Sequence, residues 1–229
     1  MGLRVEQDGA VLRVVLARAE WRNALTPAVL AGLEEVAHGL AADGEVRAVV
    51  LMAEGPDFSV GMDVAEMEGA RLPIAVLRRL ARQGARTMRA WLEVDQPVVC
   101  ALRGIANGGG ACLATACDLR VAAPGARLGY GEVRLGINLM WQALAPLAAL
   151  AGPAGAKRLV LTGALVEAET LARWALVDEV ADDPEAAALA LARELAALPP
   201  VAVQMAKRSI NVSNGTEAGP RIGARKGPP

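Results

Sequence analysis

The stretch Asn107-Gly108-Gly109-Gly110-Ala111-Cys112-Leu113 places three successive glycines between a strand-like run and a helix-like run. The preceding run is Pro97-Val98-Val99-Cys100-Ala101-Leu102, and the following one is Leu113-Ala114-Thr115-Ala116-Cys117. Glycine permits unusual φ values and close approach of a ligand to the backbone, and the N-terminal end of a helix adds unpaired N–H donors. Such a loop can hold an anion, as an oxyanion hole does, although a tight turn from strand to helix has the same composition.

Strand-like and helix-like segments alternate through the first half of the chain. Residues 3–16 alternate in polarity around Asp8-Gly9, which predicts a β-hairpin. Thr26 is predicted to cap a helix over residues 27–42. A buried strand at 48–52, a helix at about 73–93 and a strand at 98–102 follow. This alternation predicts an α/β fold with crossover connections, largely parallel strands and sites on the loops after strand ends.

The second half of the chain is rich in alanine and leucine and is predicted to be mostly helical. The expected helices cover about residues 141–151, 154–162, 167–174, 184–198 and 200–210. Residues 212–229 are rich in glycine and proline and read as a disordered or loosely attached tail. We therefore divide the chain into a core over 1–140, a helical region over 141–211 and a tail over 212–229.

Composition narrows the class of protein. With 229 residues of which 54% are hydrophobic, the chain can form a large core. A net charge of −1 and 3% aromatic residues argue against nucleic-acid binding. The N-terminus is charged and no apolar run approaches the roughly 18 residues of a membrane span, so we expect a cytoplasmic protein with no membrane partner. Three cysteines in apolar segments indicate reduced thiols, and His38 as the single histidine predicts no metal site.

Several blocks, in order and spacing, resemble the crotonase superfamily, the enoyl-CoA hydratase/isomerase family. Arg22-Asn23-Ala24-Leu25-Thr26 is similar to its early acyl-CoA-binding loop, and residues 57–67 are similar to its first oxyanion-hole loop. The longest match is residues 96–110, which includes the glycine loop. It continues through 117–122 and through Tyr130-Gly131-Glu132-Val133-Arg134-Leu135-Gly136-Ile137. The resemblance covers roughly residues 3–211.

This resemblance implies a crotonase-like ββα spiral with a helical C-terminal trimerisation region, in homotrimers or dimers of trimers. The substrate would be an acyl-CoA thioester, with no cofactor beyond the coenzyme A that is part of it. The resemblance places the oxyanion hole at the backbone N–H groups of Met62 and Gly109. Further residues expected to contact the substrate are Arg22, Ala24, Gly61, Asp63, Gly108, Gly110, Cys112 and Trp141.

The number of carboxylates decides which reaction the resemblance favours. Hydratases of the family use two glutamates, and this chain matches only the later one, Glu132. The earlier position is Cys112, whose thiol is a weak hydrogen-bonding group. We therefore expect Glu132 to act as a single acid/base in double-bond isomerisation. The alternatives are enoyl-CoA hydration and a catalytically weak acyl-CoA-binding protein.

Four of these residues also have a second interpretation. Glu132 can be a surface glutamate in a loop, and Cys112 can be a nucleophile instead of an apolar pocket residue. Asp118 reads best as a capping or turn-bonding carboxylate. Arg22 either binds coenzyme A phosphates or is an exposed loop charge. Trp141 either lines the distal acyl pocket or starts a helix.

Overall fold

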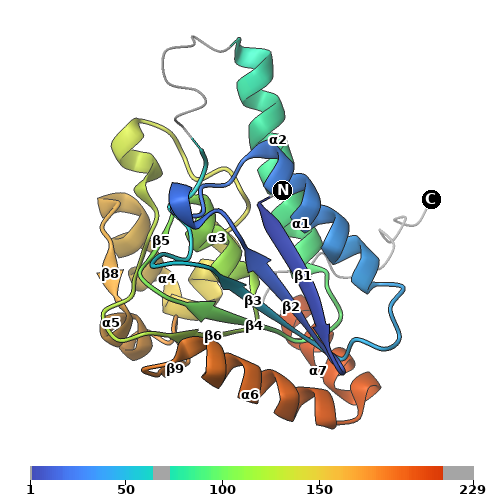
Figure 1. Ribbon diagram of the computed structural model, residues 1–229. Coiled ribbons are helices and arrows are strands. Elements are labelled where there is room, and N and C mark those ends of the chain that lie inside the picture. The colour runs from blue at the N-terminus through green and yellow to red at the C-terminus, as the bar shows by residue number, and fades with distance from the viewer. Residues whose placement is uncertain (1, 64–72, 214–229) are drawn as a thin grey trace, which may run out of the picture.

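The computed structural model describes residues 2–63 and 73–213, and within them the chain forms two sheets flanked by helices (Figure 1). The main sheet has the strand order β1-β2-β3-β4-β6-β9, and the second sheet has the order β5-β7-β8. The strands are β1 Leu3–Asp8, β2 Val11–Leu16, β3 Ala48–Ala53, β4 Val98–Leu102, β5 Ile105–Asn107, β6 Leu119–Ala122, β7 Arg127–Gly129, β8 Val166–Glu167 and β9 Glu179–Val180.

Helices connect these strands and make up most of the second half of the chain. The α-helices are α1 Pro27–Leu40, α2 Ile74–Leu92, α3 Gly109–Ala116, α4 Leu144–Thr162, α5 Ala168–Arg173, α6 Pro184–Ala197 and α7 Pro200–Ser213. Two short 3-10 helices, η1 Ala19–Trp21 and η2 Gly131–Leu135, lie in the loops.

The predicted hairpin and the largely parallel sheet are both confirmed. Strands β1 and β2 pair antiparallel with Leu3 opposite Leu16, and Gly9 takes a φ of 60° in the turn between them. The pairs β2·β3, β3·β4, β4·β6 and β6·β9 are all parallel. Parallel neighbours align their carboxyl ends at one edge, so the loops after β3 and β4 can meet there.

Helices cover both faces of the main sheet, which explains why its central strands are apolar at every position. Helix α6 lies along one face (Figure 1) and packs Ala188, Ala192 and Ala196 against it. Side chains from α1, α2 and α3 cover the other face. Along β3, Val50 contacts the α6 side and Leu51 contacts the opposite side. A strand buried on both faces reads as a continuous hydrophobic run, as was predicted for residues 48–52.

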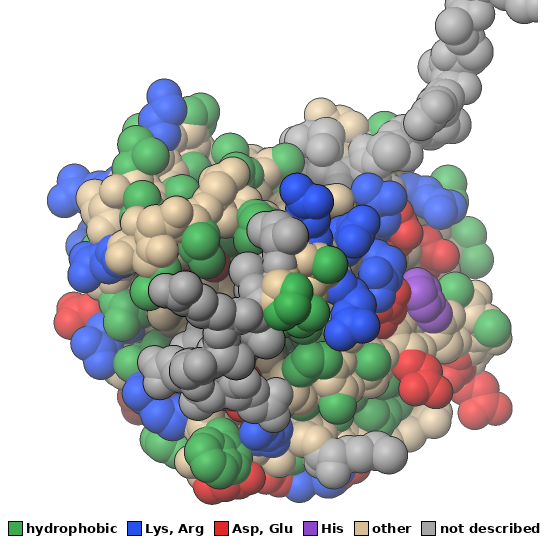
Figure 2. Space-filling view, turned by 90° about the horizontal axis from the view of Figure 1, so that it is seen from above, with side chains coloured by type: hydrophobic (Ala, Val, Ile, Leu, Met, Phe, Trp, Pro, Cys, Tyr) green, Lys and Arg blue, Asp and Glu red, His purple; other side chains and the backbone are tan. Residues whose placement is uncertain are grey.

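Helices α1 and α2 pack side by side and fix one wall of the molecule. Thr26 caps α1 as predicted, because its Oγ1 accepts a hydrogen bond of 3.2 Å from the Val29 amide. From α2, the indole of Trp91 donates to the Leu33 carbonyl at 3.1 Å. The opposite side of α2 is solvated, and Figure 2 shows basic side chains gathered on the face seen from above. The exposed arginines of α2 are Arg78, Arg79, Arg82, Arg86 and Arg89.

The structure differs from the predicted elements where a local feature overrides periodicity. Helix α3 begins at Gly109 instead of Leu113, because Gly108 with φ 51° already turns the chain into the helix. By contrast, the break predicted between the helices at 141–151 and 154–162 is present: α4 consists of two helical stretches separated at Gly152, which has a non-helical φ of 68° before Pro153. The short strands β5, β7, β8 and β9 were not predicted, since two or three residues carry too little pattern.

Helix α4 contradicts the expectation that no run is long and apolar enough to span a membrane. By length and composition α4 passes that test, as does the pair α6 and α7, which bends by 111°. Leu147 and Leu159 of α4 are fully buried in the core, and the break at Gly152 divides the helix. Only 22% of this apolar stretch is buried, so packing within the described chain accounts for only part of its apolar character. The predicted tail begins inside α7, and residues 214–229 lie outside the described part of the chain.

Candidate active site

A cavity of about 720 Å³ opens between the glycine loop, the loop over residues 60–62, η2 and α2. Apolar side chains make up most of its wall, and the two charged residues among its described lining are Glu132 and Arg134. This is the composition of a small-molecule site, in which a few polar groups orient an apolar ligand. The lining consists of Val60, Gly61, Met62, Leu80, Ala81, Asn107, Gly108, Gly109, Gly131, Glu132, Arg134, Leu135, Ile137, Asn138, Met140, Trp141, Gly163 and Leu165.

The first candidate oxyanion donor is the amide of Met62. Leu25 pairs with Met62 in a parallel bridge, in which the Leu25 amide donates to the Gly61 carbonyl at 2.7 Å. The Asp63 amide donates back to the Leu25 carbonyl at 3.0 Å. Because this ladder uses the groups on either side of Met62, the Met62 amide points away from Leu25. That amide has no acceptor among residues 2–63 and 73–213.

The second candidate donor is the amide of Gly109, the first residue of α3. A helix leaves its first amides without an intrahelical acceptor, so this N–H is free for a ligand. A Cβ atom added to Gly61 would lie 3.2 Å from the Gly109 nitrogen and 2.7 Å from the Asn107 oxygen. The two loops therefore touch, and only glycine at position 61 permits this approach. The structure thus brings the Met62 and Gly109 amides to one cavity.

Buried polar residues in the first half of the chain hold these loops in place, and sequence reasoning missed them. The side chain of Asn23 donates to the carbonyls of Glu54 and Asp57, each at 2.8 Å. Asp57 also accepts from the Ile105 amide at 2.8 Å, which ties its loop to β5. Ser59 donates to the Asn23 carbonyl at 2.7 Å. Asn23 has a φ of 54°, a conformation that asparagine tolerates better than most residues. The presence of an asparagine in this loop was therefore the one signal available in the sequence.

Glu132 is the carboxylate of the cavity. It lies in η2, is half-buried, and its Oε2 is buried without a hydrogen-bond partner within the described residues. A Cβ atom on Gly108 would come 3.2 Å from its Oε1, so the carboxyl group lies against the glycine loop. Burial raises the pKa of Glu132 above its ordinary value, because the charged form loses solvation. This is the environment of an acid/base group and not of a solvated surface glutamate.

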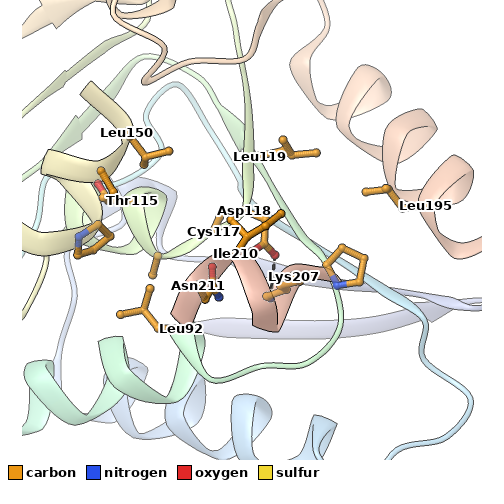
Figure 3. Close-up of a pocket in the computed structure, with 14 residues that line it drawn as sticks. Leu92, Thr115, Cys117, Asp118, Leu119, Leu150, Leu195, Lys207, Ile210 and Asn211 are labelled. Carbon is orange, nitrogen blue, oxygen red and sulfur yellow. Dashed lines mark ion pairs between the residues drawn. The ribbon is translucent and has the colours of Figure 1, made fainter. Parts of the chain in front are cut away.

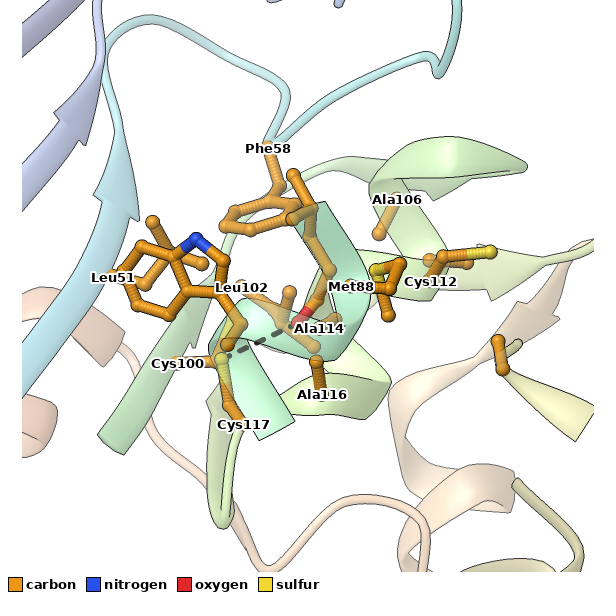
Figure 4. Close-up of a cluster of buried hydrophobic side chains, with 14 of the residues drawn as sticks. Leu51, Phe58, Met88, Cys100, Leu102, Ala106, Cys112, Ala114, Ala116 and Cys117 are labelled. Carbon is orange, nitrogen blue, oxygen red and sulfur yellow. Dashed lines mark hydrogen bonds between the residues drawn. The ribbon is translucent and has the colours of Figure 1, made fainter. Parts of the chain in front are cut away.

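Cys112 does not reach the cavity lining. Its side chain is fully buried in α3, among the core side chains that include Met88 and Ala106 (Figure 4). Burial raises the pKa of the Cys112 thiol well above its ordinary value, and the nearby charge of Glu132 adds to this effect. A nucleophilic cysteine needs the thiolate form and access to the substrate. The geometry therefore supports an apolar core role for Cys112.

The burial of the thiols predicts low chemical reactivity. Cys100, Cys112 and Cys117 are all buried, so we expect a thiol reagent to label the native protein on the order of a hundredfold more slowly than the denatured protein, through rare opening events. Labelling is followed with a chromogenic disulfide reagent with and without denaturant. The Cys112→Ala variant shows how much of the labelling occurs at this cysteine. Rapid labelling of one native thiol that is lost in this variant would restore the nucleophile interpretation.

Besides Cys112, four of the residues expected at the substrate are not among the described lining residues, and Arg22 is exposed. Arg22 donates from Nε to Asp57 at 2.7 Å, and Asp63 accepts from Arg18 at 3.1 Å. Ala24 is buried, and a Cβ atom on Gly110 would meet the Ser59 oxygen at 2.5 Å. These residues fix the loops that form the cavity. By contrast, the expected residues Gly61, Met62, Gly108, Gly109, Glu132 and Trp141 do line it.

A second, smaller cavity of about 360 Å³ lies among α3, α4 and α7 (Figure 3). Its charged residues are Lys207 and Asp118, which form an ion pair of 2.7 Å. Lys207 also donates to the Gln96 carbonyl at 2.7 Å, and Asp118 accepts from the Val98 amide at the same distance. Asp118 is therefore a turn-bonding carboxylate, as predicted, and these charges anchor α7 to the main sheet. Within the described residues, no group of three or more His, Cys, Asp or Glu side chains is arranged to hold a metal ion.

Comparisons with known proteins identify the family. The family model for enoyl-CoA hydratase/isomerase matches residues 6–221, so the chain belongs to that family. It is 32% identical over 210 residues to the short-chain-enoyl-CoA hydratase of Clostridium acetobutylicum, covering 90% of this chain and 80% of that protein. It is 35% identical over 190 residues to the cyclohexa-1,5-dienecarbonyl-CoA hydratase of Thauera aromatica, covering 81% of this chain and 69% of that protein.

The fold agrees as well. The crystal structure of an enoyl-CoA hydratase from Bacillus anthracis superposes with a TM-score of 0.89 at 31% identity, covering 96% of this chain and 85% of that one. The resemblance to the crotonase superfamily and the predicted α/β crotonase fold are therefore confirmed. Membership also makes the protein an enzyme of a family that acts on acyl-CoA thioesters.

Proposed function

We propose that this protein is an enoyl-CoA isomerase that shifts a 3-enoyl thioester to the conjugated 2-enoyl isomer. The observation that carries the proposal is the presence of one carboxylate, Glu132, among the described residues that line the cavity beside the Met62 and Gly109 amides. The position that resembles a second catalytic glutamate is Cys112, a buried thiol with a raised pKa. One carboxylate is sufficient to remove and return a proton, whereas it is poorly equipped to hold and activate a water alone.

The reaction balances with the groups of this site. The ionised Glu132 removes a proton from the carbon next to the thioester carbonyl, and the electron pair of that C–H bond delocalises into a dienolate. Its negative charge collects on the thioester oxygen, where the amides of Met62 and Gly109 donate hydrogen bonds. Protonated Glu132 then returns the proton two carbons away, and the double bond forms in conjugation with the carbonyl. The raised pKa of Glu132 suits this role, because its acid must give the proton back.

The raised pKa predicts how activity depends on pH. Glu132 must be ionised to start the reaction, so kcat/KM falls as pH decreases through the pKa of this group. We expect the midpoint of this acidic limb to lie above 4.5, the ordinary value for glutamate, because burial disfavours the charged form. A pH profile of kcat/KM measures it. A limb centred at or below the ordinary value would show that Glu132 is solvated or is not the base.

The stability of the folded protein should also depend on pH through Glu132, but in the opposite direction. Ionisation of this group raises activity and lowers stability. Below pH 4.5, Glu132 is protonated in both the folded and the unfolded chain and has no effect. As pH rises from 4.5 to the raised folded value, the unfolded chain loses the proton first, so the folded state loses stability and the deficit persists above that window. Glu132→Gln removes this deficit. At neutral pH we expect the variant to melt at a higher temperature than wild type in calorimetry, and we expect the two melting temperatures to converge in acid.

Hydration is the second candidate, and the names of the similar proteins favour it. The relatives from Clostridium acetobutylicum and Thauera aromatica are both called hydratases. A third reading is an acyl-CoA-binding protein with little turnover, since a fold and an anion site do not guarantee chemistry. Isomerisation and hydration differ in what they consume. Hydration adds water to a 2-enoyl thioester, whereas isomerisation consumes no water.

The deciding assay supplies the protein with 3-enoyl-CoA and 2-enoyl-CoA separately. Isomerisation predicts rising absorbance of the conjugated thioester from the 3-enoyl substrate, with little loss of the 2-enoyl substrate. Rapid loss of the 2-enoyl substrate to a 3-hydroxyacyl product would instead establish hydration. Acyl-CoA binding in calorimetry without turnover of either substrate would establish the binding protein. Mass identifies hydration, since only hydration adds 18 Da, the mass of water. The absorbance of the conjugated thioester separates isomerisation from binding without turnover.

Assembly and location belong to the same proposal. We expect homotrimers or dimers of trimers formed through residues 141–211, a cytoplasmic location and no cofactor apart from the coenzyme A of the substrate. Exposed apolar side chains on α7, such as Val201 and Met205, fit a helix that packs against another copy. Light scattering of the purified protein measures the mass, and a monomer at micromolar concentration would contradict the expected trimer.

A further inference from the structure

Trp141 is the one aromatic side chain among the described residues that line the active-site cavity. It lies just before α4 and is 8% exposed, so nearly all of its surface is packed against protein. Other large residues on the lining are much freer: Leu135 is 69% exposed and Met140 is 50% exposed. A buried indole is a rigid wall, whereas exposed aliphatic side chains can move aside for a ligand.

Two glycines, one on α2 and one on α3, make room for the indole. A Cβ atom on Gly84 of α2 would lie 2.0 Å from Cε2 and 2.3 Å from Nε1 of Trp141. A Cβ atom on Gly109 of α3 would lie 2.6 Å from Cζ3 and 2.8 Å from Cη2. The ring is therefore wedged between α2 and the first turn of α3. Its six-membered edge rests against the residue whose amide is the candidate oxyanion donor.

We propose that Trp141 is a specificity-determining residue that closes the space between α2 and α3 and restricts the enzyme to short acyl groups. The inference rests on the proposed function in one respect, that the thioester oxygen binds at Gly109. With that oxygen fixed, the first carbons of the acyl chain lie within a few ångströms of the indole edge. A straight chain that continues between α2 and α3 would have to occupy the volume of the ring.

Removing the indole should open this path without disturbing the oxyanion amides. In Trp141→Ala the freed volume lies between Gly84 and Gly109, neither of which has a side chain that could fill it. One methylene placed in or excluded from an apolar pocket changes discrimination by about 10-fold to 200-fold. We therefore expect the ratio of long-chain to short-chain affinity to rise by at least about tenfold.

The test measures binding of saturated acyl-CoA thioesters of short, medium and long chain length by calorimetry. Saturated ligands cannot isomerise or be hydrated, so the result does not depend on which reaction the enzyme catalyses. The variants are Trp141→Ala and the milder Trp141→Phe. The control is Trp174→Phe, because Trp174 is half-buried, packs near Arg158 and lies outside the described lining. Circular dichroism melts confirm that each variant is folded.

We expect wild type to prefer the short-chain thioester. Trp141→Ala should shift this preference toward the long chain, and Trp141→Phe should shift it partly. Trp174→Phe should leave the preference unchanged. It is overturned if folded Trp141 variants keep the wild-type ratio or weaken all chain lengths equally, since either result means that the indole is only structural. If Trp141→Ala does not fold, the ratio measured with Trp141→Phe decides alone. Failure of all acyl-CoA ligands to bind wild type would instead reject the proposed function.

Discussion

Glu132→Gln is expected to lower kcat for 3-enoyl-CoA isomerisation by about 10²–10⁴, the usual contribution of a positioned acid/base group. The amide is close to the carboxylate in shape, so the fold and the cavity stay intact, but it can neither accept nor return the proton. Oε2 of Glu132 is buried and has no hydrogen-bond partner among the described residues. No other carboxylate among the described residues lines the cavity, so no other group there can replace Glu132 as the base. KM for the thioester should change little, since the oxyanion amides remain.

A matched control is Glu194→Gln, which makes the same chemical change at an exposed position on α6. Its activity should equal that of wild type. Steady-state kinetics and acyl-CoA affinity are measured for both variants. Normal turnover by Glu132→Gln would remove this residue from the mechanism, and a loss of affinity without a loss of kcat would assign it to binding alone.

Gly61→Ala is expected to reduce kcat by about 10²–10³, the cost of losing one oxyanion donor. Gly61 has a φ of 96°, and a Cβ there would lie 2.7 Å from the Asn107 oxygen and 3.2 Å from the Gly109 nitrogen. The loops that carry the Met62 and Gly109 amides must therefore separate. Because the oxyanion develops in the transition state, kcat should fall more than the affinity for substrate.

Gly125→Ala is the control variant for the effect of backbone strain alone. Gly125 also has a positive φ, 70°, yet a Cβ added there meets no atom within 4 Å. Both variants should lose stability, by roughly 1–2 kcal/mol from the left-handed conformation, as urea unfolding measures. Only Gly61→Ala should lose turnover. Equal activity of the two variants would show that close contact of the two loops is not required for catalysis.

Much of the fold could be predicted from sequence because it follows from patterns that local physics dictates. The Asp8-Gly9 turn, the Thr26 cap and the continuous apolar run at 48–52 each have one favoured structural meaning. The second sheet could not be predicted, because its strands gain their pairing only from neighbours distant in sequence, as when Ile105 pairs with Arg127. The same limit applies to β9, which joins the main sheet through two residues.

The candidate site was predictable where the backbone is the functional group. The proposed roles of Gly109 and Met62 use their backbone amides, so the glycine loop and its resemblance to the family pointed to these residues directly. The roles of Asn23, Asp57 and Ser59 were not predictable, since polar residues in a loop become anchors only once the loop is buried. For Cys112, the role expected from the sequence was wrong. Its position in sequence placed it near the substrate, but the turn of α3 directs its side chain into the core.

The most direct test of the central claim is a crystal structure with a saturated or slowly reacting acyl-CoA thioester. The account predicts that the thioester oxygen lies 2.7–3.1 Å from both the Met62 and Gly109 nitrogens, the usual range for oxyanion-hole donors. It also predicts that a carboxyl oxygen of Glu132 faces the carbon next to the carbonyl. A thioester oxygen bound away from either amide, or Glu132 turned out of the cavity toward solvent, would contradict the account.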